Sequence, residues 1–582
     1  MASENLKQTI REYENYIQAN GVDWRVVQAY AKACAVAING ENDIHYGLQL
    51  AKRSKELTER YCLEQTGGAI WELEKYAFEH KTTNKTILEL IDCFYSVLLL
   101  EAQHKVIDSF FRYIEHKREP KERFYMPRRK QLLKIGLVDA LQGMIDDRYD
   151  ILCISLIPGA GKTTIEKFFN AAVIGWYPKD FNLFYSHSGD ITRMYYDGIY
   201  DIVTNSDEYA WNDIFPDLYV TSTNAKTEQF NVGKYKPFPS VQCTSVGSKN
   251  AGKVRASKFL LVDDMIGGIE EALNPAILEK LWSKYSVDAR QRKIKDTDGK
   301  NCKEIHIATR WSVQDVIGRI QKMYEGNPRV KIIAVPDVDP VTGKSNFDYE
   351  YSGFDEEFFA DQQLLMDDIS YKCLYKQEPI EREGLLFPED KIRRYLNLPH
   401  GVPEIVTAQC DTKGKGTDYF VMPVFQKFGE DYYCVDAVCD NTADYEMQYE
   451  NAANMLANNE VIECEFERNA GGDRVAMEVN KRVEAKGWIC NITDVPTETN
   501  KEARIFQCSN WILQHVIFKD ASKYTPKEPY GVMMTLLKQY SVSGKKQLDD
   551  VPDVFSNFAL RITQGNRTAK VEAVINPFRR FG

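Results

Sequence analysis

Apolar positions change their spacing along the chain, and this change divides it into regions. Before about residue 116 they recur at helical intervals, as in VVQAYAKACAVAI and ILELIDCFYSVLLL, with Gly67 and Gly68 as a break between them. This part contains no recognisable chemical motif. Residues 1–116 are therefore predicted to form a helical accessory or docking region.

Short apolar runs separated by helical patterns come next. The strand-like runs are LCISLI, FNLFYSH, FLLVDD, EIHIATRW and VKIIAVP. Buried parallel strands have this continuous apolar character because helices cover both faces of their sheet. The pattern predicts a doubly wound α/β domain over residues 117–345, followed by a turn-rich linker over 346–398.

A second α/β unit is predicted over residues 399–582, ending in a short basic tail. Its strand-like runs are IVTAQCD, YFVMPVFQKF, DYYCVDAV and VIECEFE. Helices are expected around Met447 to Ala457 and from about Val551.

The stretch IPGAGKTT, residues 157–164, follows the first strand-like run of the first α/β unit. A tight glycine turn between a strand and a helix binds a triphosphate through converging backbone N–H groups and a lysine, while a hydroxyl holds Mg²⁺. Leu156 stands where the usual motif has its first glycine, so the turn must form at Pro158 and Gly159. The predicted nucleotide-binding residues of this loop are Pro158, Gly159, Ala160, Gly161, Lys162, Thr163 and Thr164.

Three other segments extend this predicted ATP site. FLLVDDM delivers Asp263 and Asp264 at a strand end, where one acid can hold Mg²⁺ and the other can polarise a water. IATRW places Thr309 at a further strand end, where it either senses the γ-phosphate or only caps the strand. The basic run 117–134 contains Phe124, Tyr125 and Gln131, which suit an adenine pocket, although such a run is often only a solvated surface.

A second group of acids follows the strand-like runs of the C-terminal unit. Asp411 follows IVTAQC, Glu467 follows VIECEF, and the segment LDDVPDVF places Asp549, Asp550 and Asp553 at a helix start. Two-metal phosphodiester cleavage needs three or four carboxylates around two cations roughly 4 Å apart. The alternatives are a turn residue, a surface acid and a helix N-cap. The order and spacing of the acids favour an RNase H-like nuclease.

The ordered set of motifs resembles the large terminase subunit of tailed bacteriophages and related proviruses over residues 120 to 570. The motifs are IPGAGKT, SVGSKNAGKVRASKFLLVDDMIGG, ATRWSVQDVIGRI, LYKQEPIEREGLLF, FERNAGGDRV, NKEAR and LDDVPDVFSNFAL. The resemblance implies a RecA-like (ASCE) P-loop ATPase domain joined to an RNase H-like nuclease domain. It further implies ATP hydrolysis, Mg²⁺ at both sites with Mn²⁺ accepted by the nuclease, packaging of viral double-stranded DNA, and endonuclease cutting.

The resemblance also assigns roles to residues. Lys162 and Thr163 would bind phosphate and magnesium, Asp263 would be the Walker B acid and Asp264 the catalytic base, while Thr309 and Gln131 would belong to the coupling and adenine motifs. The nuclease metal site would contain Asp411, Glu467 and Asp550, with Asp553 nearby. Many relatives have an arginine inside the phosphate loop, which this chain lacks. Arg255 is the candidate for an arginine finger that acts on a neighbouring subunit.

Composition limits the alternatives. The chain has 582 residues, enough for about three domains, and its net charge of -11 argues against nucleic-acid binding by bulk charge alone. Its 13 cysteines include no C-x-x-C pair, which disfavours zinc and favours a reducing compartment. Residues 87–102, the most apolar segment, are interrupted by Glu89 and Asp92, so no membrane span is predicted.

The expected partners are double-stranded DNA, a portal protein, a small terminase subunit and further copies of the chain in a pentameric ring. The expected location is the cytoplasm of an infected bacterium and, transiently, the procapsid portal. A repair or defence helicase-nuclease is the alternative enzyme, but it would need a second RecA-like domain, for which residues 340–400 leave no room. A structural docking component with decayed sites is disfavoured because both groups of residues keep their charged members.

Overall fold

The computed structural model describes residues 3–247, 254–272, 274–366, 368–379, 386–412, 418–442, 444–468, 472–496, 501–541 and 547–575. The predicted basic tail after residue 575 lies outside these residues. The chain forms two compact units. The first consists of Met1–Gly267, Ala276–Gln362 and Lys372–Pro379, and the second of Gly268–Pro275, Gln363–Tyr371 and Ile380–Gly582.

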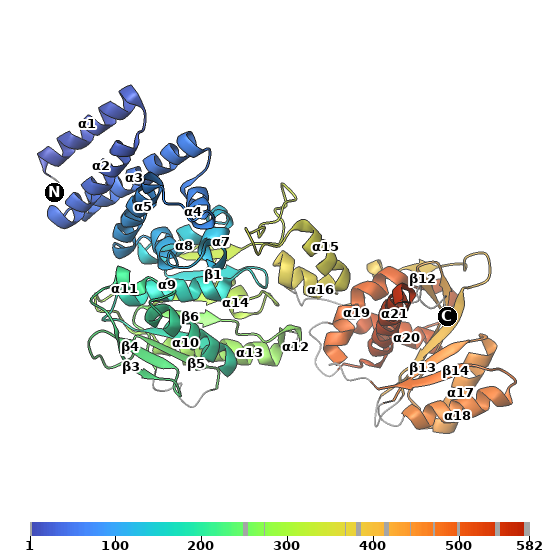
Figure 1. Ribbon diagram of the computed structural model, residues 1–582. Coiled ribbons are helices and arrows are strands. Elements are labelled where there is room, and N and C mark those ends of the chain that lie inside the picture. The colour runs from blue at the N-terminus through green and yellow to red at the C-terminus, as the bar shows by residue number, and fades with distance from the viewer. Residues whose placement is uncertain are drawn as a thin grey trace, which may run out of the picture. The chain divides into compact units, whose positions relative to one another are not determined.

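The N-terminal part is helical (Figure 1). Its α-helices are α1 (Glu4–Asn20), α2 (Trp24–Ala35), α3 (Ile44–Thr66), α4 (Ile70–Glu79), α5 (Lys85–Gln103) and α6 (Ile107–Ile114). Local signals set their ends: Asp23 and Asn84 accept hydrogen bonds from backbone N–H groups at the starts of α2 and α5, and Gly67, with φ of 73°, ends α3. The helical N-terminal region of the predicted fold class is confirmed.

An eight-stranded sheet follows in the first unit, in the order β3-β4-β5-β2-β6-β7-β1-β8. Its strands are β1 (Ile151–Ser155), β2 (Asn182–Ser186), β3 (Val220–Asn224), β4 (Gln229–Val232), β5 (Val241–Ser245), β6 (Phe259–Asp263), β7 (Lys303–Ile307) and β8 (Val330–Ala334). From β5 to β8 all neighbouring strands are parallel. Strand β7 lies between β1 and β6, as in RecA-like P-loop domains.

Every residue of β1, β2, β6 and β7 is buried, which explains the apolar runs of β1 and β6. Strand β7 differs, because it also buries the polar side chains of Lys303, Glu304 and His306. The antiparallel hairpin β3–β4 was not predicted, because β3 is a largely exposed strand of polar residues. The remaining α-helices up to residue 371 are α7 (Tyr125–Lys134), α8 (Leu137–Ile145), α9 (Lys162–Trp176), α10 (Gly189–Thr204), α11 (Trp211–Ile214), α12 (Ile269–Ala272), α13 (Pro275–Ser283), α14 (Val316–Met323), α15 (Glu356–Leu365) and α16 (Asp368–Tyr371).

The second unit contains a seven-stranded sheet in the order β14-β13-β10-β11-β12-β15-β9. Its strands are β9 (Arg394–Tyr395), β10 (Ile405–Cys410), β11 (Phe420–Phe428), β12 (Asp431–Asp440), β13 (Glu463–Glu467), β14 (Asn491–Val495) and β15 (Val516–Lys519). Strands β10, β11 and β12 form an antiparallel meander, and β13 and β14 continue parallel to β10. This is the strand arrangement of an RNase H-like fold.

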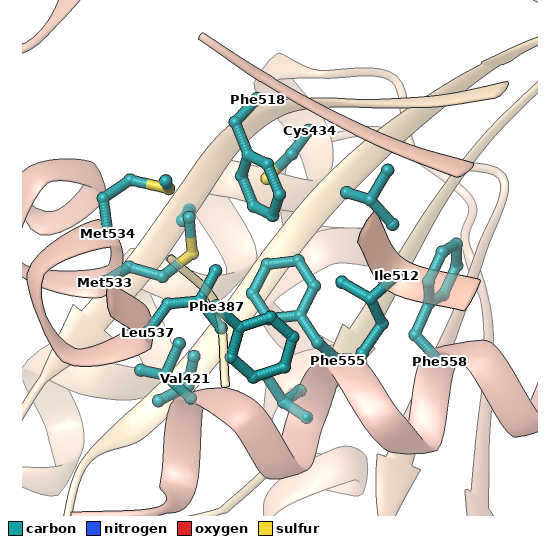
Figure 2. Close-up of a cluster of buried hydrophobic side chains, with 14 of the residues drawn as sticks. Phe387, Val421, Cys434, Ile512, Phe518, Met533, Met534, Leu537, Phe555 and Phe558 are labelled. Atoms are coloured by element: carbon teal, nitrogen blue, oxygen red, sulfur yellow. The ribbon is translucent and has the colours of Figure 1, made fainter. Parts of the chain in front are cut away.

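Helices cover both faces of this sheet (Figure 1). They are α17 (Tyr445–Asn458), α18 (Gly472–Ala485), α19 (Lys501–His515), α20 (Pro529–Gln539) and α21 (Asp550–Ile575). Figure 2 shows the core between the sheet and α19–α21, where Phe555 and Phe558 of α21 lie among Val421, Ile512 and Leu537. The Phe558 ring stacks on Phe425 with centroids 3.9 Å apart.

Together, the two sheets and the N-terminal helices confirm the predicted α/β fold class. In the part of the chain that is described, no helix is both long enough and apolar enough to cross a membrane.

Candidate functional site

The glycine loop connects β1 to α9 at the carboxyl end of the parallel sheet. Gly159 and Gly161 have φ angles of 78° and 89°, a backbone region that favours glycine. A Cβ atom on Gly161 would lie 2.5 Å from the Phe124 ring, so this aromatic side chain packs directly on the loop. Ala160 is buried, whereas Pro158 and Thr164 are half-buried in the loop and the first turn of α9. Helix α9 therefore begins at Lys162 with its N-terminal N–H groups at the loop.

Lys162 and Thr163 make different contacts from this first turn. The Lys162 ammonium donates hydrogen bonds to the carbonyl oxygens of Leu156, at 2.7 Å, and Ile157, at 3.1 Å. Burial lowers its pKa from the usual value. Thr163 Oγ1 donates a hydrogen bond of 3.0 Å to Asp263 Oδ2 at the end of β6. A hydroxyl and a carboxylate a hundred residues apart in sequence thus form a pair of oxygen ligands suited to Mg²⁺.

Asp263, Asp264 and Thr309 lie at the same edge of the sheet because β6 and β7 are parallel neighbours. Burial and the charge of Asp264 raise the pKa of Asp263 to about 7. Asp264 has φ of 39°, and its Oδ1 accepts a hydrogen bond of 3.1 Å from the Thr309 N–H. Its carboxylate is therefore oriented by the backbone of the next strand.

The residues after Thr309 connect this edge to α14. Asp315 caps α14 by accepting a hydrogen bond of 2.7 Å from the Gly318 N–H, and its other oxygen accepts one of 3.0 Å from Arg310 Nε. Arg310 and Asp315 are both buried. The strand end that carries Thr309 is thus firmly tied to a helix.

Gln131 lies in α7, the helix that begins one residue after Phe124. Its amide N–H donates to the carbonyl oxygen of Asp348, while its Oε1 is buried and accepts no hydrogen bond from any described residue. Tyr349 donates a hydrogen bond of 3.3 Å to the carbonyl of Ala160, and the Arg128 guanidinium lies 4.5 Å from the Phe124 ring centre. An unpaired amide oxygen is suited to the exocyclic amine of adenine.

Tyr125, the other aromatic residue of the predicted adenine pocket, is fully buried. Its hydroxyl donates a hydrogen bond of 2.6 Å to Asp108. Of the two predicted aromatic residues, Phe124 is the one that the structure places against the loop.

Arg255 lies before β6, at the amino-terminal edge of the sheet. Its guanidinium donates to the neighbouring Val254 carbonyl at 2.8 Å, and the next residue, Ala256, pairs with Lys293. At about 3.3 Å per strand residue, the five residues of β6 put roughly 13 Å between this edge and Asp263. The structure does not bring Arg255 to the glycine loop of its own chain. Residues 248–253 of the preceding loop lie outside the described residues.

The second group of acids meets at the carboxyl end of β10 and β13. Asp411 directly follows β10, and Glu467 is the last residue of the adjacent parallel strand β13. Asp553 joins them from the first turn of α21, and one carboxylate oxygen of each of the three lies within 4.8 Å of the others. All three are buried. Burial, followed by the charges of Asp553 and Glu467, raises the pKa of Asp411 well above its usual value.

Asp550, which the sequence placed with Asp411 and Glu467, lies outside this trio but close to it. Its Oδ2 accepts a hydrogen bond of 2.9 Å from the Tyr419 N–H. Burial raises the pKa of both Asp550 and Asp553. Of the two aspartates, Asp553 is the one with a carboxylate oxygen within 4.8 Å of both Asp411 and Glu467.

Two cations from α19 balance these acids. Lys501 Nζ lies 2.8 Å from Asp549 and 3.3 Å from Asp553. Although burial opposes it, the carboxylates of Asp553 and Asp549 raise the pKa of Lys501 above its usual range. Arg504 is buried and donates to Asp553 through Nε at 3.1 Å. A cluster of acids with two counter-cations is an oxygen-only site suited to divalent metals.

Comparison with known proteins gives matches only among solved structures, since no family model and no curated protein matches the chain. The large terminase of bacteriophage HK97 has 10% identity and a TM-score of 0.35, with 78% of this chain and 99% of that chain covered. The large terminase of a thermophilic bacteriophage, in complex with ADP, has 11% identity and a TM-score of 0.33, with 75% and 99% covered.

A third solved structure, the Mn-soaked and inhibitor-bound terminase nuclease domain of human cytomegalovirus, has 10% identity and a TM-score of 0.26. The match covers 30% of this chain and 95% of that domain's chain. These solved structures are two large terminases and one terminase nuclease domain. Identities of 10% and 11% restrict the likeness to the fold, and the fold assignment rests on the strand orders of this chain itself.

Sequence reasoning did not assign roles to several residues of these sites. Lys501 and Arg504 fall in NKEAR, a motif quoted only for the resemblance, and their spacing of three residues places both on one helix face. Glu166 of α9 is buried, and both carboxylate oxygens lack hydrogen-bond partners among the described residues. Burial, followed by the charge of Asp263, raises its pKa well above the usual value. No signal for Glu166 was available in the sequence, because three of its four neighbours one helical turn away are polar.

Proposed function

We propose that this chain is a large terminase subunit, which hydrolyses ATP to translocate viral double-stranded DNA into a procapsid and cuts that DNA with a metal-dependent endonuclease. The observation that supports this most strongly is the presence in one chain of two separate oxygen-ligand sites. One is the Thr163–Asp263 pair beside a glycine loop, and the other is the trio Asp411, Glu467 and Asp553. A phosphate-binding loop is the site of ATP hydrolysis in such a motor, and a carboxylate cluster binds the metal ions that cleave DNA.

In the proposed ATPase, the loop N–H groups and Lys162 bind the phosphates. Thr163 and Asp263 fit Mg²⁺ because they present oxygen atoms 3.0 Å apart at the loop, and bound Mg²⁺ would neutralise phosphate charge. Asp264, oriented by the Thr309 N–H, accepts a proton from the attacking water. Gln131 accepts a hydrogen bond from adenine, and the link from Thr309 to α14 transmits loss of the γ-phosphate.

In the proposed nuclease, Asp411, Glu467 and Asp553 hold divalent ions, with Asp550 beside them. Their buried, oxygen-only arrangement fits Mg²⁺ or Mn²⁺. Such ions, when bound, activate a water and stabilise the leaving oxygen of a phosphodiester. The chain's own contribution is to keep the carboxylates oriented, which the contacts of Asp553 with Arg504 and of Asp550 with the Tyr419 N–H support.

The proposed assembly is a pentameric ring on a portal protein, working with a small terminase subunit in the cytoplasm of an infected bacterium. Within the ring, Arg255 would serve a neighbouring subunit, because it lies at the sheet edge opposite its own glycine loop. An arginine at the γ-phosphate is worth roughly 10³-fold or more in rate.

The full-length chain tests this function directly. ATP hydrolysis is measured with and without linear duplex DNA, and plasmid cleavage is measured with Mg²⁺, Mn²⁺ and a chelator. DNA should stimulate hydrolysis, and cleavage should require metal. If linear duplex DNA does not change the rate of ATP hydrolysis, the proposed translocation is contradicted. If plasmid cleavage continues in the presence of a chelator, the proposed metal-dependent nuclease is contradicted.

The role of Arg255 is tested by mixing subunits. Arg255→Ala and Lys162→Ala rings should each be inactive, whereas mixed rings should recover part of the ATPase activity, because an intact pocket then meets an intact arginine. Full activity of Arg255→Ala alone, or no recovery in verified mixed rings, would remove Arg255 from the reaction.

A further inference from the structure

Lys501 lies where its ammonium faces the carboxylates at the start of α21. Besides its contacts with Asp549 and Asp553, its Nζ is 3.7 Å from Asp550 Oδ1. One ammonium group thus contacts three carboxylates, which belong to the proposed metal site or lie next to it. Carboxylates gathered in this way repel one another unless a positive charge lies among them.

The oxygen atoms that Lys501 faces are the ones left for a metal. Asp553 Oδ1 accepts from Arg504, and its other oxygen, Oδ2, lies 3.3 Å from Lys501 Nζ. Asp550 Oδ2 accepts from the Tyr419 N–H, and its Oδ1 is again the atom that faces Lys501. A divalent ion bound by these two aspartates would therefore contact the same oxygen atoms as the ammonium.

The two α19 cations differ in their freedom to move. The Arg504 side chain is only 3% exposed, and it also donates to Ser556. The Lys501 side chain is 35% exposed, belongs to the first residue of α19 and has a flexible four-carbon stem. Lys501 can turn into solvent while the helix stays folded, whereas Arg504 is fixed in the core.

We propose that Lys501 is a resident counter-cation, which occupies the Asp550–Asp553 side of the nuclease site until a divalent ion displaces it. Among the described residues the Lys501 ammonium contacts the aspartates of α21 and not Asp411, so a first ion held by Asp411 and Glu467 binds without displacing it. A second ion must expel the ammonium. The two metal ions of the site are then unequal in affinity, and cutting starts only at the higher metal concentration.

This inference rests on the proposed metal site but needs neither DNA nor cleavage to be tested. The full-length protein is titrated with Mn²⁺ by calorimetry in the absence of nucleotide, as wild type, Lys501→Met, Lys501→Arg and Asp411→Asn. Lys481→Met is the matched control, since it removes a lysine that is 62% exposed on α18 of the same unit. Thermal unfolding of each protein is followed with and without saturating Mn²⁺.

Lys501→Met is expected to tighten the weaker Mn²⁺ event by about tenfold or more, because the competing charge is gone, and to leave the tighter event nearly unchanged. Without metal, its Tm should fall below that of wild type, and Mn²⁺ should close the gap. Lys501→Arg keeps the charge and should keep the weak event. Lys481→Met should match wild type.

The inference is overturned if Lys501→Met leaves the weaker event unchanged or weakens it further. It is equally overturned if Lys501→Arg tightens binding as much as the methionine does, an outcome that remains measurable should Lys501→Met fail to fold. If Asp411→Asn changes no Mn²⁺ event at all, the proposed metal site itself is wrong. If Asp411→Asn removes an event while the lysine variants have no effect, only the counter-cation role fails.

Discussion

The glycine loop of the first unit and the carboxylate cluster of the second unit hold their charged groups in opposite ways. In the loop, the Lys162 ammonium is satisfied by backbone carbonyl oxygens and Thr163 donates to Asp263, so hydrogen bonds rather than salt bridges hold these two side chains. In the cluster, acids from β10, β13 and α21 meet at short range and depend on Lys501 and Arg504 for balance.

The difference follows from the ligands that the two sites would take. A site for an anion can be built from the N–H groups of one continuous loop, which carry partial charges and need no counter-ion. A site for cations must gather full negative charges from separate elements, and these repel one another when no cation is bound. Substitutions should therefore act locally at the loop and electrostatically at the cluster.

The largest effect is expected from Asp411→Asn, which removes a charge from the cluster. Metal-dependent plasmid cleavage should fall by roughly 10³-fold, because the ligand that holds a divalent ion is neutralised, while ATP hydrolysis should persist. Asp431→Asn is the matched control, since Asp431 begins β12 at the far end of the same sheet and pairs with Arg393. Undiminished cleavage by the Asp411 variant would exclude this residue from the reaction.

Lys162→Ala is the corresponding change at the loop. The rate of ATP hydrolysis should drop by roughly two orders of magnitude or more, because the ammonium that neutralises charge on the ATP phosphates is removed. Metal-dependent plasmid nicking should continue. The exposed Lys179→Ala serves as control. A variant that hydrolyses ATP at the normal rate, measured by phosphate release, would refute the assignment of the loop.

Gln131→Ala probes the base side of the loop, where the predicted effect is smaller. KM for ATP should rise about tenfold with little change in kcat, because one buried hydrogen bond to the base is lost. Discrimination against GTP should weaken in parallel. The control variant is Gln142→Ala, which instead loses a hydrogen bond to the Lys105 carbonyl. If the ATP and GTP kinetics of Gln131→Ala both match those of wild type, the adenine role of Gln131 is wrong.

Glu166→Gln should have the smallest effect, and it concerns stability. The pKa of Glu166 is raised in the folded state above its usual 4.5. As pH rises above about 4.5, the carboxyl group therefore ionises in the unfolded chain while it stays protonated in the folded chain, and the folded state loses stability. The glutamine variant lacks this loss. Its Tm should exceed that of wild type by a few degrees at about pH 8 and approach it near pH 4.5.

Differential scanning calorimetry across this pH range measures the Glu166 effect, with Glu89→Gln on the exposed face of α5 as control. A Tm difference that stays constant with pH would show that the buried carboxyl group does not titrate as described.

The sequence by itself determined the features that depend on neighbouring residues. The alternation of apolar runs and helical patterns was sufficient for the α/β class, because strands buried on both faces are mostly apolar. The glycine loop was recognisable because its turn, its lysine and its hydroxyl are contiguous. Asp263, Asp411 and Glu467 were identifiable as candidates because each ends a strand-like run.

Only the tertiary structure decided which side chains face one another. It placed Asp553 rather than Asp550 in the tightest carboxylate trio, added Lys501 and Arg504, and set the Gln131 amide against the Asp348 carbonyl. These relations depend on strand order and helix packing, which bring together residues separated by roughly fifty to two hundred positions, and local sequence patterns carry no information over such separations.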